Sequence, residues 1–193
     1  MSLITKSGSS GNLQDVNSRK AALVASADTD APTYIESVAA KAMTAQGDII
    51  AIESGAVKVT RIRRVIITHC GSQTSAGIVL LQLVRTTTPG AAGVVVPQIA
   101  DGASSDPAFS GIVRSSPTSL GTASVVLFQL PLFVPTLANI GPFTPQIYDM
   151  DALGLAKSMS IPVGVANGIA FRHPGAAGAA NLGATIIFTE EST

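Results

Sequence analysis

The amino-acid sequence predicts an all-β protein: a two-layer antiparallel β-sandwich with jelly-roll-like connections and an extended N-terminal arm. From Pro32 onward, short runs rich in Val, Ile, Thr and Phe alternate with turns rich in Gly, Pro and Ser. β-branched residues dominate these runs and prolines recur between them, which disfavours helices. Ten such runs are too many for one open sheet, so we expect two packed layers.

The first 31 residues differ from the rest of the chain. They are rich in Ser, Gly, Asn, Asp and Ala and carry mixed charges, among them Arg19 and Lys20. The alanines of Asn17–Ala27 favour a short helix, which would be marginal on its own. We interpret residues 1–31 as an arm that is ordered against a partner, with a disordered tail as the alternative.

The sandwich is predicted to occupy residues 32–193, and its ten strands are defined by their β-rich composition. They are Thr33–Ala42, Asp48–Glu53, Val57–His69, Ile78–Arg85, Ala108–Arg114, Ala123–Val134, Pro145–Met150, Ser158–Ile161, Asn167–Arg172 and Leu182–Thr189. In the third strand, Val57 and Val59 share a face, whereas Ile62 changes parity. This change predicts a β-bulge near Thr60–Arg61.

Four of the twelve basic residues of the chain lie on this third strand. They are Lys58, Arg61, Arg63 and Arg64. The ordinary interpretation is a solvated face of the sheet. The sharper hypothesis is a socket for acidic residues of a neighbouring subunit.

The connection after the fourth strand is long. The 22-residue stretch Thr86–Pro107 favours Greek-key or jelly-roll connections, and loops of this length are usually functional or docked on another surface. It contains the sequence PGAAG, with Pro89, Gly90 and Gly93, which recurs at residues 174–178. Neither copy is followed by the Lys and Ser/Thr of a phosphate-binding loop, so tight loop tips that contact another protein are expected.

Composition excludes several classes of protein. The net charge is zero, which argues against nucleic acid as a partner, and the single cysteine, Cys70, excludes an internal disulfide or a cysteine zinc site. Only 12% of the residues are charged and 46% are hydrophobic. Five prolines interrupt the charge-free run between Arg114 and Asp149, so it is not expected to span a membrane. The N-terminus lacks the apolar core of a signal peptide. The charge-poor surface therefore predicts assembly with other protein.

Few residues are suited to catalysis. The chain has two histidines, and it lacks the nucleophile-elbow and zinc-protease motifs, so no enzymatic activity, cofactor, metal or small-molecule substrate is expected. Asp149 and Asp151 share a strand face, where a solvated edge is more common than a cation site. A carbohydrate-binding sandwich is an alternative, although Trp is absent and Tyr occurs only at positions 34 and 148.

The order of the sequence segments in residues 33–191 resembles that of small structural proteins of tailed bacteriophages. It is carried by TYIESVAAKA, SGAVKVTRIRRV, SSPTSLG, LFVP, PQIYDMD, GIAFRH and ATIIFTEE. The resemblance implies an all-β virion component without catalytic residues. It would be a decoration or cement protein on the capsid exterior, assembled in the host cytoplasm. Its partners would be the major capsid protein, other virion proteins and its own copies, as a dimer or trimer. A head-fibre, tail-fibre or adaptor component that contacts the host is the alternative.

Overall fold

The chain forms two compact units, Met1–Ala31 and Pro32–Thr193. The computed structural model describes residues 4–7, 12–16, 22–23, 31–42, 45–69, 77–96, 107–134, 145–154, 159–164, 166–173 and 181–192. All regular secondary structure in these ranges is β-strand.

The N-terminal unit contains a small antiparallel sheet. Its strands, in the order β1-β2-β3, are β1 (Ile4–Ser7), β2 (Asn12–Val16) and β3 (Ala22–Leu23). The expected helix over Asn17–Ala27 is wrong at Ala22–Leu23, which pair with β2 instead. Nucleation of so short a helix is unfavourable, whereas pairing with β2 gives the main chain of Ala22 and Leu23 hydrogen-bond partners. The extended arm stays a prediction, and Arg19 and Lys20 lie outside the described residues.

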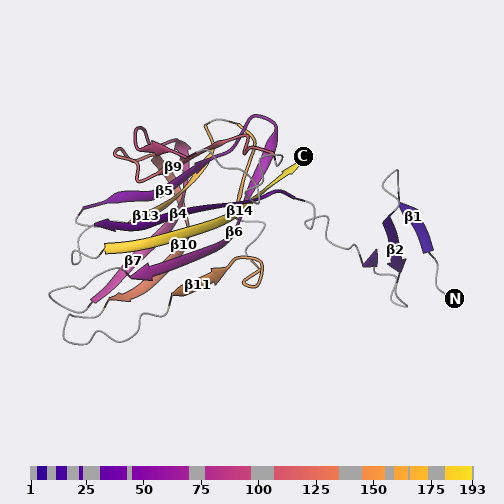
Figure 1. The fold of residues 1–193 in the computed structure, drawn as a ribbon, viewed down its shortest axis with the longest axis horizontal. Coiled ribbons are helices and arrows are strands. Elements are labelled where there is room, and N and C mark those ends of the chain that lie inside the picture. Colours follow the sequence, from indigo (N-terminus) through magenta and orange to yellow (C-terminus); the bar gives the residue numbers. More distant parts are fainter. Residues whose placement is uncertain are drawn as a thin grey trace. The chain divides into compact units, whose positions relative to one another are not determined.

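The second unit is built from two sheets (Figure 1). The six-stranded sheet contains, in spatial order, β10 (Thr122–Val134), β7 (Gly77–Thr88), β13 (Gly168–His173), β5 (Gly47–Glu53), β9 (Ile112–Ser115) and β8 (Val94–Val95). The five-stranded sheet contains β11 (Gln146–Asp149), β6 (Lys58–His69), β14 (Asn181–Ser192) and β4 (Thr33–Ala42), with β12 (Ser160–Ile161) also paired to β6. The prediction of an all-β protein with two antiparallel sheets is confirmed.

The pairing of the strands is nested. Strand β7 pairs with β10, β6 with β11, β5 with β13, and β4 with β14, all antiparallel. The chain thus pairs with itself like one long hairpin whose tip lies between β7 and β10. Two further pairings, β13 with β7 and β14 with β6, join the segments of this double ribbon into the two sheets.

The predicted strands match the observed ones closely. Each of the ten occurs, and β4 has the predicted bounds. The largest difference is β9, which begins at Ile112 rather than Ala108, because Ser110 is hydrogen-bonded to the side chain of Glu190 instead. The sequence did not predict β8, whose two residues are too few to show a period.

A β-bulge occurs in β6, but not where the sequence places it. The register passes from Ile187 opposite Arg64 to Phe188 opposite Ile62, so Arg63 is the extra residue. Thr60 and Ile62 before the bulge, and Val65 and Ile67 after it, are all buried. The predicted site near Thr60–Arg61 is wrong because Val57 is exposed and does not belong to the inner face.

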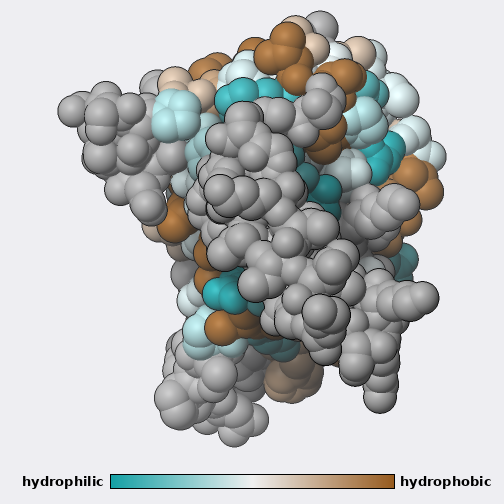
Figure 2. All heavy atoms as spheres, turned by 90° about the vertical axis from the view of Figure 1, so that its right-hand side faces the viewer, coloured by the Kyte–Doolittle hydropathy of each residue, from teal (hydrophilic) through white to brown (hydrophobic). Residues whose placement is uncertain are grey.

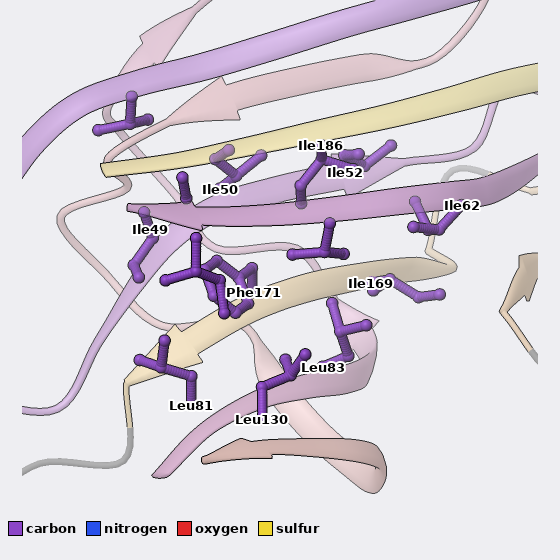
Figure 3. Close-up of a cluster of buried hydrophobic side chains, with 14 of the residues drawn as sticks. Ile49, Ile50, Ile52, Ile62, Leu81, Leu83, Leu130, Ile169, Phe171 and Ile186 are labelled. Atoms are coloured by element: carbon purple, nitrogen blue, oxygen red, sulfur yellow. The ribbon is translucent and has the colours of Figure 1, made fainter. Parts of the chain in front are cut away.

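The core lies between the two sheets (Figure 3). Ile62 of β6 and Ile186 of β14 come from one sheet, and Leu83, Leu130 and the other labelled side chains come from the opposite sheet. Branched aliphatic side chains dominate, as expected where strands bury one face against another layer. This core holds the long strands rigidly and leaves function to their edges, outer faces and loops.

Candidate functional site

The four basic residues of β6, here called the basic cluster, all lie against acidic residues of the same chain. Glu191 on the neighbouring strand β14 binds two of them: Arg61 Nη2 is 2.7 Å from its Oε2, and Arg63 Nη2 is 2.9 Å from its Oε1. The bulge turns Arg63 so that its other terminal nitrogen, Nη1, also lies 3.0 Å from Asp151 Oδ1. Glu191 therefore bridges two arginines across the β6–β14 pair.

Asp149 neutralises the fourth member of the cluster. Its Oδ2 lies 2.8 Å from Arg64 Nη2, and its Oδ1 accepts hydrogen bonds from the backbone N–H groups of Asp151 and Ala152. The backbone hydrogen bond from Ala152, followed by the guanidinium of Arg64, lowers the pKa of Asp149 below its usual value. Asp149 and Asp151 thus serve as partners of arginines. The basic cluster already has its counter-charges within this chain. A socket for acidic residues of a neighbouring subunit stays a prediction.

Glu190, next along β14, is the centre of a second polar group. Its side chain is fully buried, and Oε2 lies 3.4 Å from Lys58 Nζ and 3.4 Å from the hydroxyl of Tyr34. Its Oε1 accepts hydrogen bonds from the N–H of Ser110, at 3.0 Å, and from the Ser110 hydroxyl. The carboxylate thereby fastens the end of the long connection to the last strand.

Tyr34 is part of the core. Its ring lies 5.4 Å from Phe188 and 5.3 Å from Phe109, between centroids, and its hydroxyl also lies 3.2 Å from the carbonyl oxygen of Pro107. Burial, and then the negative charge of Glu190, raise the pKa of Tyr34 to about 12. Because the ring has no exposed face, Tyr34 does not offer a stacking platform for a sugar.

A buried ion pair lies on the outer face of the six-stranded sheet. Arg172 Nε is 2.6 Å from Asp48 Oδ1, and Nη2 donates to Asp48 Oδ2 at 3.1 Å and to the carbonyl of Gly121 at 2.8 Å. Gly121 N–H donates back to Asp48 Oδ2 at 3.3 Å. The pair therefore clamps the start of β10 onto β5 and β13. Next in sequence, burial lowers the pKa of His173.

The first PGAAG loop packs against the turn that precedes β10. Ser119 holds it with three hydrogen bonds: its Oγ donates to the Ala91 carbonyl and accepts from the Ala91 N–H, and its own N–H donates to the same carbonyl. Gly90 is buried, and a Cβ on it would lie 2.5 Å from the Ser119 carbonyl oxygen. Gly93 has φ of +91°, which favours glycine. These residues, with Pro89, form a clamped loop, and the second copy at 174–178 lies outside the described residues.

Exposed hydrophobic residues gather on the outer face of β7 and β10. Phe133 lies opposite Ile78 across this strand pair, and Pro131 lies opposite Leu80. Ile78 is 62% exposed and Phe133 60%, and we call these four residues the outer apolar patch. Figure 2, which draws one face of the molecule, shows exposed hydrophobic residues lying among hydrophilic ones. The outer apolar patch carries no charge, so its contact with water is unfavourable in the free chain.

Comparisons with protein-family models, curated proteins and solved structures give no match for this chain. In the part of the chain that the structure describes, no three His, Cys, Asp or Glu residues are grouped as metal ligands would be. Likewise, none of the described segments is a helix of the length and apolar character needed to cross a membrane. The likeness to phage structural proteins therefore stays a prediction.

The sequence identifies the basic cluster but not its partners. Glu190 and Glu191 are 132 and 130 positions away from Lys58 and Arg61, respectively. A signal was nevertheless present, because TEES at the end of the chain complements KVTRIRR in charge. Two strands of opposite charge are candidates for adjacent pairing. Asp48 and Arg172 had no comparable signal, since neither β5, which carries Asp48 and Glu53 at its two ends, nor β13 contains a cluster of charged residues.

Proposed function

We propose that this protein is a structural component of a tailed-bacteriophage virion, a jelly-roll module that binds and bridges major capsid subunits. The observation that carries the proposal is the nested pairing of the strands. The eight strands involved are, in chain order, β4, β5, β6, β7, β10, β11, β13 and β14. The first pairs with the eighth, the second with the seventh, the third with the sixth, and the fourth with the fifth. A double ribbon rolled in this way into two sheets is the wiring of a jelly roll.

The jelly roll is a common architecture of viral capsid domains, and it also occurs in lectins and cupins. A fold does not determine a function, so the surface must supply the distinction. Lectin activity would be expected to use exposed Trp or Tyr rings, and the chain has no Trp. Tyr34 is buried, and Tyr148 packs against Phe128 with ring centroids 6.0 Å apart. Among the described residues, these features favour a structural role over carbohydrate binding.

Charge supports the same proposal. The arginines and lysine of the basic cluster are matched by acidic residues of their own chain, so they do not create a strong field for nucleic acid. The outer apolar patch is left as a contact surface. A stable protein interface buries about 800 Å² on each partner, and many weaker contacts suffice on a particle because repetition supplies avidity.

Particle fractionation tests this function. Virus-sized particles from cultures that make the protein should carry it through a density gradient, whereas recovery only in the soluble fractions would refute the proposal. Phe133→Ser should reduce its occupancy on the particles. The matched control is Val57→Ser, which alters an equally exposed residue, 68%, away from the patch. Equal occupancy of the two variants would exclude the outer apolar patch as the contact surface.

A further inference from the structure

Among the described residues, the strand paths of the two large sheets end on four strands, and three of these ends are protected against pairing with another chain; β12, which lies off these paths, has only two residues. Strands β8 and β11 are short, with two and four residues. Strand β10 has thirteen residues but is interrupted by three register shifts. At its residue Pro131 no N–H exists, and the carbonyl oxygen already accepts a hydrogen bond from the Tyr148 hydroxyl at 3.3 Å. An incoming strand would find these edges short or blocked.

Strand β4 is the fourth edge, and its main chain is open. Pro32 accepts a hydrogen bond from the N–H of Glu190, which fixes the alternation along this antiparallel pair. Tyr34 and Glu36 therefore direct their main-chain groups toward β14. Thr33, Ile35 and Ser37 direct theirs away from it, and no described residue contributes a main-chain partner to these three.

The open stretch also lacks the side chains that usually protect an edge. Its outward residues Thr33, Ile35 and Ser37 are uncharged, and Ile35 is 58% exposed. The bulge of β4 lies further along, between the positions that pair with Ala184 and Leu182. Lys41, which also lies beyond this stretch, directs its amine to the carbonyl oxygen of Asp48. An edge without proline, bulge or outward charge is a template for another strand.

We propose that β4 pairs antiparallel with β4 of a second copy of this chain, about a twofold axis at Ile35. In this register Ile35 faces Ile35 of the partner subunit, and Thr33 faces Ser37 of the partner subunit. All three open positions become hydrogen-bonded pairs, which exchange six main-chain hydrogen bonds. The result is one continuous sheet across both copies.

A second copy fits this edge better than an unrelated strand because the edge is self-complementary. The three open residues are spaced symmetrically around Ile35, which suits an isologous interface. The same register places an exposed apolar side chain against its own copy and a threonine against a serine, both favourable cross-strand pairs. This inference goes beyond the proposed function, because it assigns a surface to the self-association that the sequence resemblance implies.

Sedimentation equilibrium of the full chain over a range of concentrations tests the interface. Ile35→Lys places two positive charges face to face and should raise the dissociation constant of the dimer about tenfold or more. The matched control is Ile147→Lys, because Ile147 is 59% exposed and lies on β11, the opposite edge of the same sheet. The control should dimerise like the unmodified chain, and both variants should unfold at similar temperatures.

Two further variants keep the test decisive if a lysine disturbs folding. Ile35→Pro removes an outward N–H without removing a hydrogen bond to β14, and should abolish the dimer. Ile35→Cys in a Cys70→Ser background should form an intermolecular disulfide on oxidation, since facing Cα atoms in such a pair are about 5.5 Å apart. Ile147→Cys in the same background should not.

The outcomes separate this interface from the proposed function. A dimer that Ile35→Lys and Ile35→Pro leave intact would overturn pairing through β4 while leaving self-association in place. A chain that stays monomeric at every concentration would overturn the β4 interface and self-association, whereas capsid binding is tested separately by the particle fractionation. A monomer that instead binds an extended peptide of another protein along β4 would show that the edge is open but that the occupant is not a second copy, which also overturns the proposal.

Discussion

The ion pair between Asp48 and Arg172 allows a quantitative test of how the loop before β10 is held. The side chain of Asp48 is inaccessible and that of Arg172 is 6% exposed. Asp48→Asn leaves the guanidinium of Arg172 buried without an opposite charge. Arg172→Met likewise leaves the carboxylate of Asp48 buried without an opposite charge. Removing one partner of a buried pair costs about 3–5 kcal/mol of the free energy of unfolding.

The double variant Asp48→Asn/Arg172→Met should cost less than the sum of the two single variants, because no charge is then left buried without a partner. A coupling of about 2–3 kcal/mol is expected between residues in one network. In a chain of this size, each kcal/mol corresponds to about 2–4 °C in Tm, so each single variant should lose about 6–20 °C.

Urea denaturation of all four proteins measures these free energies, provided that the slope with urea concentration is unchanged. Two results would refute the reasoning. Single variants that each lose less than about 1 kcal/mol would mean that the pair is solvated in solution. Additive losses in the double variant would mean that the two side chains act independently.

Three further predictions concern the loops, the aromatic core and the basic cluster. Gly93→Ala should lower the free energy of unfolding by about 2–4 kcal/mol, because its φ is positive and its Cβ would lie 2.8 Å from the Cα of Pro117. The control Gly154→Ala, also at positive φ but in open space, should lower it by only about 1–2 kcal/mol. Equal losses in urea denaturation would exclude the steric contact. Because the pKa of Tyr34 is raised from 10 to about 12, the folded state retains a proton that the unfolded state releases, so its contribution is present below pH 10 and lost as the pH rises toward 12. The stability advantage of the unmodified chain over Tyr34→Phe should therefore shrink between pH 9 and pH 12 in denaturation experiments, and a constant difference would contradict the assignment. Arg61→Ala should cost less than about 1 kcal/mol, and less still in high salt, because Arg61 and its partner are both partly exposed; a loss above 2 kcal/mol would show that the cluster is a buried network.

The strands were predictable because the alternation that marks them is local. In β4, for example, buried Tyr34, Glu36 and Val38 alternate with exposed Ile35 and Ser37, and the predicted bounds hold. The bulge in β6 was placed three residues too early because Val57 and Val59 are apolar without being core residues. Hydropathy alone does not distinguish an apolar residue at the rim from one inside.

The site was only half predictable, because it depends on which distant strands become neighbours. The sequence identified Arg61 and Arg63 but had no means to place Glu191 beside them before the pairing of β14 with β6 was known. The clamp between Asp48 and Arg172 depends on the same long-range pairing of β5 with β13. Local patterns indicate where charges lie along a strand, whereas topology decides which charges meet.

The nested ribbon also has a consequence for the order of folding. Its tip joins Thr88 to Thr122, 34 positions apart, whereas Tyr34 and Glu190 are 156 positions apart, so we expect the tip to close before Tyr34 meets Glu190. Such high contact order predicts folding in milliseconds to seconds. During synthesis β4 leaves the ribosome among the first strands of the sandwich, while its partner β14 is made last. Until β14 has been made, β4 is therefore unpaired along both edges, so a chain truncated before residue 181 would expose two template edges and aggregate.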